Sequence, residues 1–240
     1  MTSGGGSSLM TRGKPTGMLG AVLRPVVTLA CLGLACTLHG DGEQGSETRE
    51  LPAFTAIEVF DGFAATVTID PALPAGAPVA LTVAGDSNAL GRLFTVLHGD
   101  ATLSAAVDPN HLTELSLGPT VTASVPALAS GFAEDTSTLE IFGARGELAL
   151  EVHESASVML HDGEGLRVTA RAIDDGLLTL AGEGPSLELV VEGAAAVDAG
   201  GFMAAAVTVR ARGTGAIRVC ATETIKIYGS GAGQVALDCG

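Results

Sequence analysis

Aromatic side chains are rare in this chain, which has no tryptophan, one tyrosine and seven phenylalanines among its 240 residues. Proteins that bind sugars usually stack them on exposed aromatic rings that carry a polar edge. The single tyrosine, Tyr228, does not make such a platform, so the sequence gives no support for carbohydrate recognition by stacking. We assign the phenylalanines to the hydrophobic core.

Basic residues are also scarce, with 12 lysines and arginines against 27 aspartates and glutamates. Three of the basic residues and none of the acidic ones precede Cys36, so the chain from Cys36 onward has a net charge of −18. Binding to nucleic acid needs clustered lysine and arginine, so no nucleic-acid partner is predicted. Direct binding to an anionic membrane is disfavoured for the same reason, and we expect membrane attachment to come from a lipid.

The motifs of common active sites are missing as well. The chain has no G-x-S-x-G elbow, no G-x-G-x-x-G after a buried strand, no G-x-x-x-x-G-K-S/T loop and no H-E-x-x-H zinc motif. We therefore predict no catalytic residues, no cofactor and a protein that is not an enzyme. A site assembled from residues distant in sequence is the alternative.

What the chain does contain is an internal repeat of about nineteen residues, which begins at Leu148 and continues to the end of the sequence. The runs of alternating apolar residues that open each unit are 18, 21, 20 and 18 positions apart: Leu148–Val152, Leu166–Ala170, Leu187–Val191, Val207–Ala211 and Ile225–Ile227. A second short run follows some ten residues later: Val158–Leu160, Leu178–Leu180, Val197–Ala199, Ile217–Val219 and Val235–Leu237.

This repeat predicts an all-β solenoid. Alternation places apolar side chains on one face of a strand and polar side chains on the other. One unit with two such strands cannot enclose a core, so the next unit must cover it, and equivalent strands stack in parallel. We expect 18–21 residues per coil, with glycines such as Gly213 and Gly215 at the corners. An antiparallel sandwich of evenly spaced strands is the alternative.

Similar short strands begin at Leu51, so we predict one domain over residues 51–240. Alternation is clear in Ala65–Ile69, Val79–Val83 and Val121–Val125. No stretch shows helical periodicity over ten residues, and only residues 87–93 are compatible with a short helical turn.

The first 36 residues have the pattern of an export signal. Arg12, Lys14 and Arg24 occur there without any acidic residue, and a ten-residue apolar run, Val26–Ala35, follows them. This run is too short to span a membrane, which takes about 20 apolar residues. We predict a signal peptide over residues 1–36.

The end of the signal, Leu34-Ala35-Cys36, resembles that of a bacterial lipoprotein, in which the cysteine is lipidated and becomes the first mature residue. Gly33 departs from the leucine usual at its position, and cleavage by an ordinary signal peptidase is the alternative. Cys31 is a poorer lipidation site because it would shorten the apolar run. Residues 37–50 are polar and rich in glycine, so we expect a flexible tether there.

The mature domain resembles the head-GIN domain family from about residue 49 to residue 240. The motifs that carry the resemblance are residues 49–59, Thr66–Ile69, Leu81–Asn88, the Val125-Pro126 step and the closing glycine repeats at 213–219 and 229–231. Members are described as auto-transporter adhesins. The resemblance implies a right-handed parallel β-helix on an exported bacterial protein, commonly a lipoprotein, without agreed catalytic residues.

Two cysteines remain in the domain, Cys220 and Cys239. They occupy the fourteenth and fifteenth positions of consecutive units, so stacked coils bring them close, and a bulge would absorb the one-residue offset. Exported proteins fold in an oxidising compartment. We predict a disulfide between them; two free buried thiols are the alternative.

Two sets of residues have metal-binding chemistry without the spacing of a metal motif. These are His153 and His161 for zinc, and Asp86, Asn88, Asp174 and Asp175 for calcium. The two histidines fall on different strands of one unit and can point away from each other, and the acidic set does not follow a calcium-loop pattern. We therefore predict no metal site.

Together these features predict a non-enzymatic, adhesion-like module of the cell envelope, carried on a lipid anchor, with an unidentified envelope or surface partner. A stack of coils offers long flat faces for many weak contacts. One alternative is a structural solenoid whose ends stack into homo-oligomers. Another is an enzyme acting on envelope polysaccharide, whose basic residues would have to come from Arg167, Arg171, Arg210, Arg212 and Arg218.

Overall fold

The computed structural model describes residues 38–99, 101–108, 113–229 and 234–239, so the predicted signal peptide and Cys36 lie outside the described residues. The described chain is a β-solenoid of about five turns, which confirms the predicted fold class. Its one helix is a short 3-10 helix, η1 (Ser87–Arg92), at the place where the sequence predicted a helical turn. Within this part of the chain, no helix is long and apolar enough to cross a membrane.

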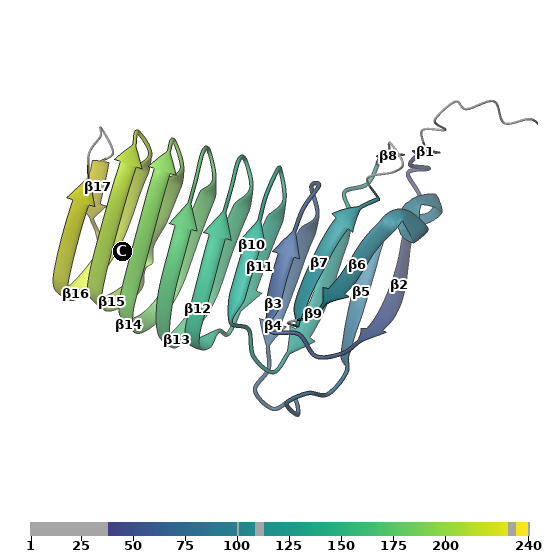
Figure 1. Cartoon of the computed structure of the whole chain (residues 1–240), viewed down its shortest axis with the longest axis horizontal. Helices are drawn as coiled ribbons and strands as arrows, with labels where there is room; N and C mark the ends of the chain where they lie inside the picture. Colours follow the sequence, from purple (N-terminus) through teal and green to yellow (C-terminus); the bar gives the residue numbers. More distant parts are fainter. Residues whose placement is uncertain (1–37, 100, 109–112, 230–233, 240) are drawn as a thin grey trace, which may run out of the picture. The chain divides into compact units, whose positions relative to one another are not determined.

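The strands form two walls, and each regular coil contributes one strand to each wall (Figure 1). Wall 1 consists of β6 (Leu93–His98), β7 (Thr102–Val107), β3 (Ala56–Val59), β10 (Ser130–Ala133), β12 (Arg145–Val152) and the second halves of β13 (Ser157–Ala172), β14 (Leu177–Gly193), β15 (Ala196–Gly213) and β16 (Ala216–Gly229). Wall 2 consists of β2 (Gln44–Leu51), β5 (Val79–Asp86), β9 (Thr120–Val125), β4 (Ala64–Ile69), β11 (Thr138–Phe142), the first halves of β13 to β16, and β17 (Gln234–Leu237). A separate pair joins β1 (Leu38–His39) to β8 (Thr113–Glu114).

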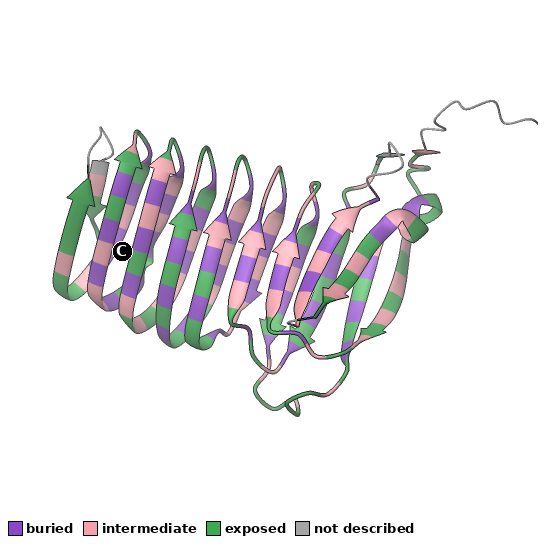
Figure 2. Ribbon diagram, viewed as in Figure 1, coloured by how far each residue is buried: buried purple, intermediate pink, exposed green. Residues whose placement is uncertain are grey.

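The core is built from equivalent residues of successive coils, which stack above one another between the walls. Val168, Leu187 and Val207 are paired in this order across β13, β14 and β15, and all three are buried. The alternation of buried and less buried residues continues along nearly every strand (Figure 2). Each coil therefore covers the apolar side chains of the next, as the repeat predicts.

The order of the coils differs from their order in the sequence. β3 and β4 come first along the chain, yet β3 lies between β7 and β10, and β4 lies between β9 and β11. After β4 the chain forms β5, η1 and β6, adds β7 and β9 on one side of the β3–β4 coil, and returns with β10 on its other side (Figure 1). The antiparallel strands β6, β5 and β2 thus occupy the N-terminal end of the stack.

Residues 44–51 form β2, so the prediction of a flexible tether over residues 37–50 is wrong for most of that segment. β2 pairs with β5 in antiparallel fashion along its full length. The guanidinium group of Arg49 donates to the carbonyl oxygens of Leu90 and Leu93 on the neighbouring segment. A polar edge strand of this kind has few apolar residues, and its composition therefore looks like that of a linker.

The carboxylate of Asp86, at the end of β5, ties three segments together. It is fully buried and accepts hydrogen bonds from the backbone N–H groups of Gly42 at 2.8 Å, Ser116 at 2.8 Å and Leu117 at 3.0 Å. A buried carboxylate is tolerated when N–H groups satisfy its oxygens. Asp86 therefore fixes the chain before β2 and the chain after β8 to the end of wall 2.

Asp41 makes a second, exposed set of contacts at the same place. Its carboxylate accepts hydrogen bonds from the Ser87 hydroxyl at 2.6 Å and from the backbone N–H of Asn88 at 3.2 Å. The Ser87 hydrogen bond is the main cause that lowers the pKa of Asp41. The Asn88 side-chain amide in turn donates to the carbonyl oxygen of His39 at 2.9 Å.

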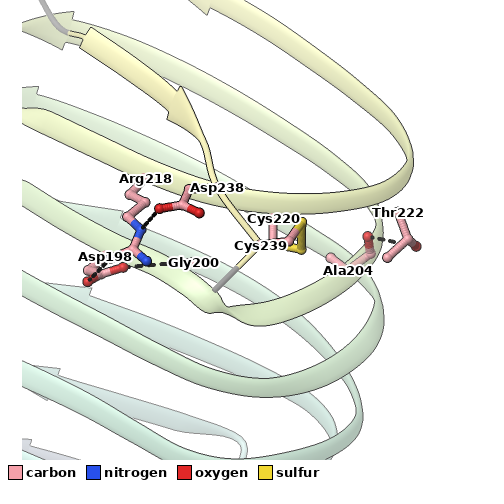
Figure 3. The surroundings of a disulfide bond; sticks show 8 residues. All are labelled: Asp198, Gly200, Ala204, Arg218, Cys220, Thr222, Asp238 and Cys239. Atoms are coloured by element: carbon pink, nitrogen blue, oxygen red, sulfur yellow. Dashed lines mark hydrogen bonds and ion pairs between the residues drawn. A yellow bond between two sulfur atoms is a disulfide. The ribbon is translucent and has the colours of Figure 1, made fainter.

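At the other end of the stack, Cys220 of β16 is joined to Cys239, with their Cα atoms 4.7 Å apart (Figure 3). The sequence predicted that a bulge would absorb the one-residue offset between the two cysteines in their units. Cys239 instead lies beyond the end of β17, where no strand pairing has to be interrupted. Arg218 contacts both Asp198 of the preceding coil, at 3.4 Å, and Asp238, at 3.0 Å. The disulfide and these ion pairs hold the final segment against wall 2.

Removing the disulfide should destabilise the protein by about 3 kcal/mol, because the bond closes a loop with a sequence separation of 19 residues. We expect Cys239→Ser to lower the free energy of unfolding by this amount in denaturant titrations. Cys239 is the better position because it is exposed, whereas Cys220 is buried. A reducing agent should have the same effect on the wild type and none on the variant; two reactive thiols in the denatured, unreduced wild type would contradict the bridge.

Candidate functional site

The outer surface of wall 1 carries a shallow groove that crosses the coils. Its floor is a row of small residues paired in order on β3, β10, β12 and β13: Ala56, Ser130, Ala149 and Thr169. One side is a parallel row of larger residues: Glu58, Phe132, Glu151 and Arg171. The hollow between these rows has a volume of about 420 Å³, and a second hollow of about 400 Å³ adjoins it at Ala149 and Thr169. We call the two hollows together the wall 1 groove.

The groove follows from the repeat. Residues two positions apart on a strand face the same side of the sheet, so each coil presents one small and one large residue outward, as with Ala149 and Glu151. Stacking in parallel register then aligns the small residues into a floor and the large ones into a side wall. The second hollow has its own charged side, formed by Glu147, Arg167 and Glu188.

Several charged side chains beside the groove are paired with one another, most of them across the coils. Oε1 of Glu151 lies 2.7 Å from Nε2 of His153 and 3.4 Å from Nη1 of Arg171. Arg171 also contacts Glu192 at 3.4 Å, and Glu192 contacts Arg212 at 3.9 Å. Such exposed pairs add little stability, so their main effect is to orient the side chains that border the groove.

Two phenylalanines lie on this outer surface as well. The ring centroids of Phe60 and Phe132 are 5.5 Å apart, and Phe132 meets the His153 ring edge-on at 5.1 Å. The assignment of all seven phenylalanines to the core is therefore wrong. Phe54, Phe63 and Phe202 are buried, whereas the others occupy outward positions because the strand alternation places them there: Phe60, Phe94, Phe132 and Phe142.

This arrangement suits noncovalent binding of an extended ligand. The small residues of the floor allow a ligand chain to approach the sheet closely, and the bordering carboxylates and guanidinium groups offer both acceptors and donors. Charges of both signs border the groove, with Glu151 and Arg171 paired to each other, so the groove does not present one sign of charge alone. Many modest contacts along the groove would add up over several coils.

The structure does not bring the two candidate zinc ligands together. His153 follows β12 in wall 1, where it contacts Glu151, while His161 lies on β13 in wall 2 and stacks on Phe142 at 4.4 Å. The intervening core separates the two walls. Among the described residues, no group of three or more His, Cys, Asp or Glu side chains is placed to hold a metal ion.

The candidate calcium residues are also separated. Asp86 and Asn88 belong to the N-terminal end of the stack, where their side chains bind backbone groups of neighbouring segments. Asp174 and Asp175 form a turn between β13 and β14. Asp174 has a φ of 58°, a backbone conformation that aspartate adopts more readily than most residues. The two pairs lie in different parts of the stack and do not form one site.

Four of the five arginines considered for an enzymatic face share wall 1. Arg167 and Arg171 are on β13, and Arg210 and Arg212 are on β15, all in the half of the strand that belongs to wall 1. Arg218 lies in wall 2, where it pairs with Asp198 and Asp238. The four in wall 1 point outward and are exposed.

The sequence reasoning missed the groove floor. Alanine, serine and threonine at the outward positions of a strand carry no chemical signature on their own. The signal that could reveal them is positional: small residues at matching places in successive coils. That signal requires the pairing of β3 with β10, which the sequence order of the coils conceals.

The two walls, the aligned rows and the groove define the class of this protein, a β-solenoid with a shallow groove on its outer face. The family model described as "Putative auto-transporter adhesin, head GIN domain" matches residues 53–240, and the chain belongs to that family. The resemblance drawn from the sequence motifs is thereby confirmed. No functionally curated protein matches the chain.

Solved structures share the fold at low sequence identity. A "putative adhesin" from Bacteroides fragilis is 16% identical, with a TM-score of 0.66, over 83% of this chain and 99% of that one. A "putative adhesin" from Parabacteroides distasonis is 16% identical, with a TM-score of 0.59, over 84% and 96%. A "putative lipid binding protein" from the same organism is 13% identical, with a TM-score of 0.57, over 83% and 98%. The chain spans nearly the full length of each.

Proposed function

We propose that this protein is a non-enzymatic, adhesion-like module of the cell envelope that binds an extended partner along the wall 1 groove. The observation that carries the proposal is the groove itself, with a continuous floor of small residues across four strands and paired charges beside it. Its family and its structural relatives are named for adhesion, which supports a role in binding.

The proposal includes a lipid anchor at Cys36. The anchor rests on the sequence of residues 1–36, which has the basic, apolar and small-residue segments of an export signal ending at a cysteine. Residue 36 lies two positions before β1, which belongs to the N-terminal end of the stack. An anchor there would leave the outer surface of wall 1 free for a partner.

One experiment tests the groove and the anchor separately. Bacterial cells that lack the protein are complemented with wild type, Cys36→Ala, Ala149→Arg or Ala64→Arg, and their adherence to one another and to a surface is measured at equal protein levels. Ala149 and Ala64 are both exposed, outward-facing strand residues, but only Ala149 lies in the groove. A large arginine side chain at position 149 fills the floor, while the same change at position 64 alters wall 2.

We expect Ala149→Arg to reduce adherence to the level of cells without the protein, and Ala64→Arg to leave it unchanged. Cys36→Ala should release the protein from the membrane fraction, and its mature N-terminus should lose the diacylglycerol mass. Equal adherence of wild type and Ala149→Arg would eliminate the groove as the binding site. An unmodified wild-type N-terminus would eliminate the anchor and leave the groove untouched.

A further inference from the structure

Most basic residues of this acidic protein are matched by a carboxylate. Six of the nine described lysines and arginines have a carboxylate oxygen within 4.0 Å: Arg49, Arg92, Arg145, Arg171, Arg212 and Arg218. The other three, Arg167, Arg210 and Lys226, have no such partner among the described residues. Unmatched cations are unexpected in a chain with more than two acidic residues for each basic one.

Two of these three unmatched cations lie together at the C-terminal end of wall 1. Arg210 of β15 is paired in register with Tyr228 of β16, and its guanidinium carbon lies 5.7 Å from the centre of that ring. Lys226 lies two residues before Tyr228 on the same face of β16, and Arg212 follows two residues after Arg210. The hollow lined by Arg210, Arg212 and Tyr228 has a volume of about 290 Å³. We call Arg210, Arg212 and Lys226 the basic patch.

Apolar side chains are exposed at the same end of the stack as the basic patch. Ile227 is 49% exposed and Leu237 is 61% exposed, whereas their counterparts one coil earlier, Val209 and Val219, are fully buried. The reason is that the second half of β16 and the strand β17 are the last described strands of the two walls. This end of the stack therefore presents cations, one tyrosine and core-type aliphatic residues together.

We infer that this end of the solenoid binds the phosphate groups of an anionic phospholipid surface. Guanidinium and ammonium groups recognise phosphate by charge-assisted hydrogen bonds. Tyrosine places its ring in apolar surroundings and its hydroxyl in water, which suits the headgroup region. Ile227 and Leu237 would lie against the boundary of the acyl chains.

The strongly negative total charge does not prevent such contact. At physiological salt, exposed charges are screened over about 8 Å, so the lipid surface responds mainly to the charges nearest to it. Glu192 is the acidic residue that contacts the patch, through Arg212 at 3.9 Å, and it is shared with Arg171. The sequence analysis disfavoured direct membrane contact because it rested on the net charge. The net charge does not show that cations without carboxylate partners gather at one end of the stack.

The test uses exported protein carrying Cys36→Ala, so that no acyl chain of its own contributes and the outcome is independent of the proposed anchor. Sedimentation is measured with vesicles of phosphatidylglycerol and phosphatidylcholine in equal parts, and with phosphatidylcholine alone. We expect binding only to the anionic vesicles, weakened by added salt. Arg210→Gln combined with Lys226→Gln should reduce the apparent affinity roughly thirtyfold. Arg167→Gln, which removes the third unmatched cation two coils before Arg210, should have little effect on vesicle binding.

Several results would overturn the inference. Equal binding to both kinds of vesicle would show that apolar contact alone drives it. Binding of inorganic phosphate without binding of vesicles would assign the patch to a soluble ligand. A dimer in light scattering that Ile227→Glu dissociates would make this end an interface between copies. Absence of sedimentation by a protein with an unchanged thermal unfolding profile would exclude the lipid surface.

Discussion

Replacing Gly213 with alanine is expected to destabilise the protein by about 4 kcal/mol, because two separate penalties coincide there. Gly213 ends β15 at a corner and has a φ of 149°, a conformation that residues with a Cβ atom rarely adopt. A Cβ atom at this position would also run into the backbone of Gly193, the residue it pairs with in the preceding coil. The corner backbones of the two coils are too close to admit it.

The measurement is the free energy of unfolding from denaturant titration, with Gly118→Ala as the matched control. Gly118 makes the same chemical change at an exposed position where an added Cβ atom meets no heavy atom within 4 Å, and it does not have a positive φ. The control should stay within about 0.5 kcal/mol of the wild type. A loss below about 1 kcal/mol for Gly213→Ala would mean that the corners can relax, contrary to close stacking of the coils.

The regular coils could be predicted from the sequence because the alternation of apolar and polar residues within each strand shows which side chains face the core. In β12 the alternating residues Leu148, Leu150 and Val152 are buried, and the residues between them are not. The same pattern recurs every 18–21 residues, so the strands assigned in one unit predict those of the next unit. The long strands β13 to β16 were not foreseen, since pairing between successive coils continues through the corners, where the residues do not alternate cleanly.

The N-terminal end of the stack could not be predicted in the same way. The position of the β3–β4 coil between two later coils depends on contacts between residues about 45 to 75 positions apart, as in the pairs Ala56↔Thr102 and Ser130↔Ala56. Local periodicity contains no information about which later strand an early one will meet. β2 was misread for a related reason: its buried contacts are made by Arg49 and by backbone groups rather than by apolar side chains.

Part of the wall 1 groove follows from local alternation, and part depends on the order of the coils. The outward positions of β12 and β13 follow from alternation, so Ala149 and Glu151 could be placed on one face from the sequence. The extension of the floor to Ala56 and Ser130 follows only from the altered coil order. The basic patch could not be predicted either. Its definition depends on which arginines have a carboxylate within reach on a neighbouring coil, and the sequence does not show those distances.

Removal of the Asp86 carboxylate is the second substitution expected to have a large effect. Asp86→Ala leaves three backbone N–H groups, those of Gly42, Ser116 and Leu117, without their charged acceptor. A hydrogen bond to a charged acceptor contributes about 1.5–3 kcal/mol, so we expect the loss of three to cost about 3–5 kcal/mol after partial relaxation and solvation of the donors. Amide hydrogen exchange and denaturant titration measure it. Asp41→Ala, at an exposed carboxylate of the same region, is the control and should have a much smaller effect.

A third variant separates local hydrogen bonding from general damage to the core. Oδ2 of Asp86 accepts from Ser116 and Leu117, while Oδ1 accepts from Gly42. Asp86→Asn retains one carbonyl oxygen and replaces the other by an NH₂ group, which cannot accept. The asparagine should turn its oxygen toward Ser116 and Leu117, because this orientation satisfies two donors, whereas the opposite one satisfies only Gly42. The amide hydrogens of Ser116 and Leu117 should then stay protected from exchange, while that of Gly42 exchanges faster. If all three amides lose protection equally, the carboxylate acts through its charge or volume, and the N-terminal end of the stack is held by its strand pairing instead.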